Sequence, residues 1–393
     1  MRASGLTRST TWLRRHWRGS SFVAAGLALP FGAAVLAGGW YYAGRIEDGA
    51  LRVDHSPAEM NLRVVDVAGG RLTLESRHDQ PETSDWWADG IFGLAWDGGY
   101  AQVSTIRQID KRHSVRDVRI IEGEQKPDTW TRLDSFAYPG DPKRAHDLEF
   151  TDVQMRGELG TMPAWFVDAP GDVWAILVHG QGANRREFLR MLPAIHGAGL
   201  KALVITYRND VEAPASANRR YGFGATEWRD VEVAAAYALE HGAKGLVLGG
   251  MSMGGGIVMS FLRNSAQAAA VRALILDAPM LDFRASVDFR SGGVPTFIAR
   301  TGQRLASLRY GVDWDELDYL SRASAWRVPI LLFHGDADGS VPVSTSDALA
   351  ARRPDLVTYV RLPGVRHVRS WNAGPEAYES AVSAFVAKAR PGS

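Results

Sequence analysis

Short apolar runs alternate with helical stretches over the C-terminal part of the chain. The runs are nearly continuous, a pattern typical of strands buried on both faces of a parallel sheet. Strand and helix in alternation predict an α/β fold, a mostly parallel sheet with right-handed crossovers and helices on both faces. The predicted strands are residues 173–178, 202–206, 245–248, 273–276, 328–333 and 357–360, and the clearest predicted helices are 187–194, 228–240 and 344–352.

A different pattern occupies residues 50–141, where glycine turns join pairs of short runs. Ala68-Gly69-Gly70 separates one pair and Asp97-Gly98-Gly99 separates a second, which predicts two β hairpins. The strands expected from this pattern are 62–67, 71–75, 93–96, 100–106 and 118–121. No long helical periodicity interrupts them, so we predict a small β-rich segment. A turn-rich linker at 139–143 then leads into a domain over 145–390, which begins with a hairpin of 148–155 and 162–167.

The N-terminal residues predict a membrane segment. Residues 20–43 carry no charged side chain, and as a helix this stretch is long enough to cross about 30 Å of hydrocarbon. Its end carries Trp40, Tyr41 and Tyr42, the rings expected at a headgroup layer. The arginines of residues 1–19 precede it, namely Arg2, Arg8, Arg14, Arg15 and Arg18.

The side on which these arginines lie predicts the topology. Positive residues favour the cytoplasmic side, so 1–19 is expected in the cytoplasm and the rest of the chain outside, held by a single-pass transmembrane helix. Small residues of the kind found at signal cleavage sites, Ala34, Ala37 and Gly39, leave a second interpretation open. In that case the segment is removed and the protein is secreted.

Composition narrows the function classes. The chain has 393 residues, of which 46% are hydrophobic and 23% charged, as in globular proteins. The formal net charge is +1, so no basic excess indicates nucleic-acid binding. The absence of cysteine excludes disulfides, thiol nucleophiles and cysteine-ligated zinc.

The strand predicted at 245–248 runs into a glycine-rich turn around Ser252. Gly250, Ser252 and Gly254 form the pattern G-x-S-x-G ahead of a helical stretch. In such a turn the serine backbone is strained, and flanking glycines remove the side-chain clashes that would forbid it. The N–H of Met253 then lies at a helix N-terminus, where developing negative charge is stabilised. Alone, the pattern also fits a turn whose serine merely caps the helix.

Other polar residues follow the remaining predicted strands. In parallel sheets reactive groups collect at the carboxyl ends of strands. His179 follows the strand at 173–178, His334, Asp336 and Asp338 follow the strand at 328–333, and His367 follows the last strand. A serine nucleophile needs a histidine to accept its proton and a carboxylate to orient that histidine, and all three residue types are present at strand ends.

Four of these segments, in this order along the chain, resemble the α/β-hydrolase superfamily. They are Val178-His179-Gly180-Gln181-Gly182, Gly250-Met251-Ser252-Met253-Gly254, His334-Gly335-Asp336-Ala337-Asp338-Gly339-Ser340-Val341-Pro342 and Pro363-Gly364-Val365-Arg366-His367. The resemblance covers about residues 145–389 and extends to serine esterases and serine aminopeptidase-like members. It implies the α/β-hydrolase fold, with the triad in the family's order of serine, acid and histidine.

The resemblance also implies a role for each residue. Ser252 is the expected nucleophile, His367 the base and Asp338 the acid, because the pattern H-G-x-x-D-x-x-V-P places the acid there. Asp336 is then expected to shape the turn. The N–H groups of Gln181 and Met253 are the expected oxyanion donors. His179 is expected to brace the oxyanion loop and His334 to be structural.

A long connection over 280–325 follows the fourth parallel strand, and the resemblance implies that it forms a lid. Its large apolar residues either line an acyl pocket or form the buried side of the lid, namely Phe283, Phe289, Phe297, Leu305, Tyr310 and Trp314.

These observations predict a serine hydrolase that cleaves a carboxylic ester through an acyl-enzyme outside the cytoplasmic membrane. The expected partners are a small-molecule ester or acyl substrate and the membrane, and neither a metal nor an organic cofactor is implied. Two alternatives use the same triad, a serine peptidase and an acyltransferase. A non-catalytic, membrane-anchored binding protein is the alternative from a different class.

Overall fold

The computed structural model describes residues 31–81 and 84–388. These residues belong to two compact units. The smaller unit contains residues 31–51 and Ser291–Asp313, and the larger contains Arg52–Arg290 and the residues from Trp314 onward.

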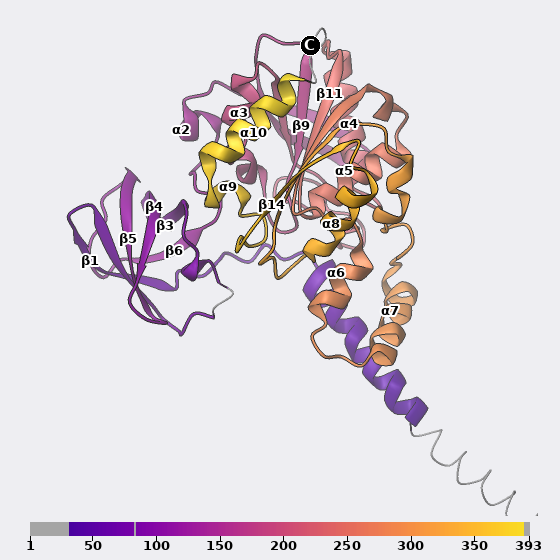
Figure 1. Cartoon of the computed structure of the whole chain (residues 1–393), viewed down its shortest axis with the longest axis horizontal. Coiled ribbons are helices and arrows are strands. Elements are labelled where there is room, and N and C mark those ends of the chain that lie inside the picture. The colour runs from indigo at the N-terminus through magenta and orange to yellow at the C-terminus, as the bar shows by residue number, and fades with distance from the viewer. Residues whose placement is uncertain (1–30, 82–83, 389–393) are drawn as a thin grey trace, which may run out of the picture. The chain divides into compact units, whose positions relative to one another are not determined.

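The larger unit is built on an eight-stranded sheet in the order β14-β13-β12-β11-β9-β10-β8-β7 (Figure 1). The strands from β14 to β10 run parallel, while β8 pairs antiparallel with β10 and with β7. The predicted parallel sheet and the hairpin that precedes it are therefore present. The strands are β7 (Thr151–Gly157), β8 (Gly160–Val167), β9 (Val173–Val178), β10 (Lys201–Ile205), β11 (Gly245–Met251), β12 (Val271–Asp277), β13 (Ile330–Gly335) and β14 (Val357–Leu362).

Helices connect and cover these strands (Figure 1). The helix predicted at 187–194 is instead two pieces, a 3₁₀ helix over Arg185–Arg190 followed by α3. Pro193 explains the break, because proline is tolerated in the first turn of an α-helix but not in its interior. The α-helices of this unit are α2 (Pro142–His146), α3 (Leu192–Gly197), α4 (Trp228–Glu240), α5 (Met253–Asn264), α6 (Phe283–Arg290), α8 (Val343–Arg352), α9 (Ser370–Ala373) and α10 (Pro375–Ala387).

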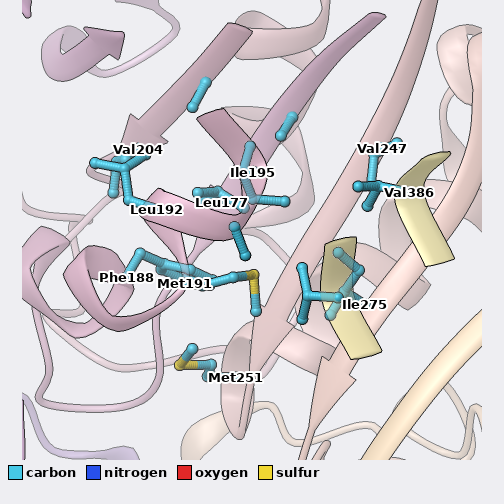
Figure 2. Packing of buried hydrophobic residues seen from close by; sticks show 14 of the residues in the cluster. Leu177, Phe188, Met191, Leu192, Ile195, Val204, Val247, Met251, Ile275 and Val386 are labelled. Carbon is cyan, nitrogen blue, oxygen red and sulfur yellow. The ribbon is translucent and has the colours of Figure 1, made fainter. Parts of the chain in front are cut away.

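Alternate residues of each central strand enter one hydrophobic core. In β9, Val173, Ala175 and Leu177 belong to it, as expected when successive side chains point to opposite faces. Figure 2 shows Leu177, Val204, Val247 and Ile275 from four strands meeting Leu192 and Ile195 of α3 and Val386 of α10. The intervening strand residues Trp174, Ile176 and Val178 are also buried. Burial on both faces explains why the strands read as continuous apolar runs.

The β-rich segment forms a closed barrel of six antiparallel strands in the order β1-β2-β5-β4-β3-β6. Pairing of β1 with β6, through Leu62 with Thr131, closes it. The sequence pattern did not predict β6 and predicted only part of β5, because the buried positions of these strands are polar, namely Ser114 and Arg116 in β5 and Thr131 and Asp134 in β6. The strands are β1 (Leu62–Ala68), β2 (Arg71–Ser76), β3 (Phe92–Trp96), β4 (Gly99–Gln108), β5 (His113–Glu122) and β6 (Trp130–Asp134).

The predicted lid contains α6 and, in the smaller unit, α7 (Thr296–Tyr310). Two of its six large apolar residues, Phe283 and Trp314, are buried and stack on each other with ring centres 5.4 Å apart. Phe223 packs against Phe283 at 4.2 Å. For these two residues the packing favours the buried side of the insertion over a pocket lining.

The smaller unit pairs α7 with a helix over residues 31–46, which ends in a π-helical turn at Glu47–Leu51. The two helices approach closely, since a Cβ atom on Gly39 would lie 2.5 Å from the Thr301 methyl group. Within residues 31–81 and 84–388, no helix combines the length and apolar character needed to cross a membrane. Residues 20–30 of the predicted membrane segment lie outside the described part of the chain.

Gly254 tests how tightly α5 packs on the sheet. A Cβ atom at this position would clash with the carbonyl oxygen of Val178 at the end of β9. We expect Gly254→Ala to lower the free energy of unfolding by about 2–3 kcal/mol, measured by urea denaturation. Gly197→Ala is the matched control because a Cβ there meets no atom within 4 Å, and alanine favours the helix. Equal stability of the two variants would contradict the packing described.

Candidate functional site

Ser252 lies alone between β11 and α5, in a strained backbone conformation. Its φ is 52° and its ψ is −118°, a region that costs a residue with a side chain about 1–3 kcal/mol. Backbone hydrogen bonds hold it there. Its N–H donates to the Asp277 carbonyl at 3.0 Å, and its carbonyl accepts the N–H of Met280 at 2.9 Å.

The glycines of the motif permit this turn. A Cβ atom on Gly250 would lie 2.7 Å from the carbonyl oxygen of Gly254, and a Cβ on Gly254 would clash with Val178. Both positions therefore require glycine for the backbone to approach its neighbours. The turn presents the Ser252 side chain at the carboxyl end of β11.

The structure brings Ser252, His367 and Asp338 together in one hydrogen-bonded line. His367 Nε2 lies 2.8 Å from Ser252 Oγ, and His367 Nδ1 lies 2.6 Å from Asp338 Oδ2. An ionised carboxylate only accepts hydrogen bonds, so the proton on His367 belongs on Nδ1. That tautomer leaves Nε2 able to accept the hydroxyl proton of Ser252.

Asp338 is held in its ionised form. Burial alone raises the pKa of this carboxyl, but hydrogen bonds from His334 and His367 outweigh it, and the pKa lies well below its ordinary value. Oδ1 also accepts the N–H groups of Ser340 and Val341 at 2.7 and 2.9 Å. A fixed negative charge at this point orients His367 and stabilises its imidazolium form.

Asp336, in the loop that carries Asp338, and His334, near the end of β13, occupy supporting positions. Asp336 accepts the N–H of Gly364 at 2.7 Å and a guanidinium N–H of Arg361 at 2.9 Å, which ties two loops together. His334 is fully buried, with Nδ1 2.7 Å from Ser346 Oγ and Nε2 3.1 Å from Asp338 Oδ2. Neither residue is hydrogen-bonded to Ser252.

The loop after β9 passes directly beside Ser252. A Cβ atom on Gly180 would lie 3.2 Å from the Ser252 Cβ. The N–H of Gly180 donates to Glu187 Oε2 at 2.8 Å, and the next residue along this loop is Gln181, the oxyanion donor expected from the sequence. The second candidate, the N–H of Met253, belongs to the first residue of α5. Both candidates therefore border the Ser252 turn.

The buried side chain of His179 supports the loop after β9. Its side chain is fully buried and stacks on Tyr207 with ring centres 4.5 Å apart. Its Nε2 lies 2.9 Å from Asp210 Oδ2, and the Tyr207 hydroxyl donates to the Gly180 carbonyl at 3.0 Å. Burial lowers the pKa of His179, but the Asp210 carboxylate outweighs this effect and raises the pKa above its ordinary value.

Three buried charged residues lie next to the site, Glu187, Arg190 and Asp277, and the sequence pattern assigned none of them a role. Glu187 and Arg190 both lie within the helix predicted at 187–194, and nothing in the local pattern separates them from solvent-facing charges. Asp277 had one available signal, since it follows a predicted strand. It accepts the Ser370 hydroxyl at 2.8 Å, near the start of α9.

Among residues 31–81 and 84–388, no group of three or more histidine, aspartate or glutamate side chains has a metal-binding arrangement.

Solved structures of esterases share the architecture that positions this site. The esterase Pf2001 of Pyrococcus furiosus has 17% sequence identity and a TM-score of 0.50, covering 64% of this chain and 94% of that one. A second crystal form of this esterase has 18% sequence identity and a TM-score of 0.51, covering 64% of this chain and 95% of that one. XC6422 of Xanthomonas campestris, described as an α/β serine hydrolase without lid, has 18% sequence identity and a TM-score of 0.45. The match covers 62% of this chain and 97% of that one. Neither a protein-family model nor a curated protein sequence matches the chain.

The chain has the α/β-hydrolase fold. At these identities the Pyrococcus structures establish the fold alone. The sheet order and the Ser252 turn agree with that assignment.

Asp277 makes the stability of the fold depend on pH. Burial raises the pKa of its carboxyl from 3.8 to about 6, against a lowering by the Ser370 hydroxyl. Folding therefore takes up a proton between these values, and the free energy of unfolding falls as the pH rises through this window. The loss amounts to up to about 3 kcal/mol. Asp277→Asn removes the ionisation, so we expect its Tm to fall less than that of the wild type between about pH 4.5 and 7.5.

Differential scanning fluorimetry on both proteins measures this difference. The low pKa of Asp338 and the raised pKa of His179 are common to the two proteins and cancel in the comparison. Parallel Tm profiles would show that Asp277 does not titrate in this window.

Proposed function

We propose that the protein is a serine hydrolase that cleaves a carboxylic ester through an acyl-enzyme on Ser252. The observation that carries the proposal is the line of hydrogen bonds from Ser252 Oγ to His367, at 2.8 Å, and from His367 to Asp338, at 2.6 Å. The strained Ser252 backbone and the fold shared with an esterase support it.

In the acylation half-reaction, Ser252 Oγ attacks the ester carbonyl carbon while His367 Nε2 takes the hydroxyl proton. The carbonyl oxygen becomes negative and is stabilised by the N–H groups of Met253 and Gln181. The intermediate then breaks its bond to the alkoxy group, which takes the proton from His367 and leaves as an alcohol. The acyl group remains bonded to Ser252 Oγ.

In the deacylation half-reaction, water attacks the acyl carbon and gives its proton to His367. The second intermediate breaks its bond to Ser252 Oγ, which recovers the proton, and a carboxylic acid leaves. Asp338 stays ionised throughout, because its surroundings hold its pKa low, and it stabilises the imidazolium of His367 in both halves.

A location outside the cytoplasmic membrane is part of the proposal. Its support is the uncharged stretch 20–43 behind an arginine-rich N-terminus. The helix over 31–46 also exposes large apolar side chains, including Phe31 at 63% and Tyr41 at 68%. Exposed apolar side chains on one helix are compatible with contact with a lipid surface.

Ser252→Ala removes the nucleophile, and we expect it to lower kcat for p-nitrophenyl esters at least about a thousandfold and to abolish fluorophosphonate labelling. Asp338→Asn is expected to lower kcat by about 10³–10⁴, because His367 then loses the charge that sets its tautomer. Ser383→Ala, on α10, is the matched control and should behave as wild type. Full activity and labelling of Ser252→Ala would refute the proposal.

Amide substrates and an added acyl acceptor distinguish the related activities. Ester hydrolysis that greatly exceeds amide hydrolysis supports an esterase over a peptidase. A new ester formed with an added alcohol, at the expense of free acid, would identify an acyltransferase instead. Absence of turnover and of labelling in the wild type would favour a non-catalytic binding protein.

Protease treatment of intact cells tests the location. With the larger unit outside the membrane, added protease should degrade it while a cytoplasmic marker survives. Separation of membranes from medium then distinguishes an anchored from a secreted protein. Protection of the larger unit until the cells are lysed would contradict the proposed orientation.

A further inference from the structure

The loop that carries His367 has a backbone that needs outside support. It connects β14 to α9, and its Val368 has a φ of 52°, a region that β-branched residues rarely adopt. Such a conformation persists only where surrounding contacts hold it. The side chain of His367 can reach Ser252 and Asp338 only while this loop keeps its place.

Arg190 supports the loop from within the hydrolase domain. Its side chain is 1% exposed, and Nη1 donates to the Val368 carbonyl at 3.1 Å and to Asn372 Oδ1 at 2.6 Å. Nη2 lies 3.8 Å from Glu187 Oε1. The other oxygen of Glu187 accepts the N–H of Gly180 at 2.8 Å. One buried cation therefore connects the loop that carries His367 to the loop after β9, which carries Gly180 and Gln181.

Asn372 carries this support across to the β barrel. It is completely buried, and Nδ2 donates to the carbonyl oxygens of Ile91 at 2.6 Å and Ser135 at 2.9 Å. Its own backbone carbonyl accepts the N–H of Ile91 at 2.9 Å. The amide orientation follows from its partners, since Oδ1 faces the donor-only guanidinium of Arg190 and Nδ2 faces two acceptors. Ile91 precedes β3 and Ser135 follows β6, and these two strands are neighbours in the barrel. Asn372 of α9 therefore contacts the barrel at one end of this strand pair.

A second link joins the barrel to the loop near His367. Asp85 begins a 3₁₀ helix that precedes β3, and its Oδ2 accepts the Nε–H of Arg369 at 2.8 Å, while Nη2 of the same guanidinium lies 2.8 Å from it in an ion pair. The remaining Nη1 of Arg369 donates to the carbonyls of His367 at 3.0 Å and Val368 at 3.2 Å. A barrel carboxylate thus fixes an arginine that holds the backbone of His367 itself.

We propose that the β barrel is a positioning element for His367, acting through Asp85 with Arg369 and through Asn372. The inference rests on the proposed function, because it assigns the barrel a part in serine hydrolysis. Arg369 and Asn372 are positioning residues that act through the loop. A positioning element acts on the base and not on bound substrate, so loosening the barrel misplaces His367 and lowers kcat while KM is nearly unchanged.

Asp85→Ala in the full-length protein tests the first link. We expect kcat for p-nitrophenyl esters and the rate of fluorophosphonate labelling to fall about tenfold, with KM within about twofold of wild type. Asp85→Glu, which keeps a carboxylate near Arg369, should recover part of the loss. Asp117→Ala is the control, because Asp117 lies on the barrel and pairs with Arg71 at 3.2 Å, away from the loop. It should leave kcat unchanged.

Gly90→Ala tests the second link. Gly90 has a φ of 120°, and a Cβ atom there would clash with the Asn372 carbonyl and push the barrel away from α9. Gly98→Ala is the control, because Gly98 also has a positive φ of 78° but a Cβ there meets no atom within 4 Å. We expect at least a tenfold lower kcat for Gly90→Ala than for Gly98→Ala.

The outcomes separate this inference from the proposed function. Equal kcat values for the link variants and their controls, with labelling abolished in Ser252→Ala, would overturn the inference alone. A higher KM at unchanged kcat would also overturn it, because the barrel would then serve substrate binding. Labelling that persists in Ser252→Ala would overturn the proposed function first.

Discussion

The backbone conformation of Ser252 is the constraint on which the rest of the site depends. Its φ of 52° carries the hydroxyl out of the sheet at the end of β11, and it exists only because Gly250 and Gly254 leave room for the neighbouring backbone. The Asp277 carbonyl and the Met280 N–H fix it from the adjacent strand and loop. Strain of this kind is characteristic of functional sites, where the surrounding fold compensates for it. Here the compensation comes from a sheet buried on both faces.

Around this turn, the two loops that complete the site share one buried cation. Arg190 binds the carbonyl beside His367, and through Glu187 it is linked to the N–H of Gly180 in the oxyanion loop. A guanidinium is suited to this position because it offers several donors in a rigid plane and stays charged. Arg190 is buried, and an unpaired buried charge is costly, so loss of one of its partners would destabilise its contacts with both loops. The positions of the loop after β9 and of the His367 loop are therefore set together.

The sequence was most informative where local pattern decides structure. Apolar runs predicted the parallel strands, and polar residues at their ends predicted where Ser252, Asp338 and His367 would lie, which the structure brings within hydrogen-bonding distance. Local pattern failed where distant residues decide. Closure of the barrel pairs Leu62 with Thr131, and Asn372 binds Ile91, 281 positions away. No periodicity encodes such contacts, and the identity of an arginine such as Arg190 does not show whether its side chain is buried or exposed to solvent. One error was local. Pro193 indicated that a helix could not continue through residues 187–194, but the surrounding apolar pattern still led to the prediction of one helix.

Reactivity of Ser252 toward an acyl or phosphonyl group is what the proposed contact with His367 requires. The most direct measurement is peptide mapping by mass spectrometry after reaction of the native protein with a fluorophosphonate. We expect one phosphonyl adduct per chain, on the peptide that contains Ser252, and loss of this adduct when the protein is unfolded before the reaction. An adduct on a different residue, or equal labelling of Ser252 in the unfolded chain, would contradict it.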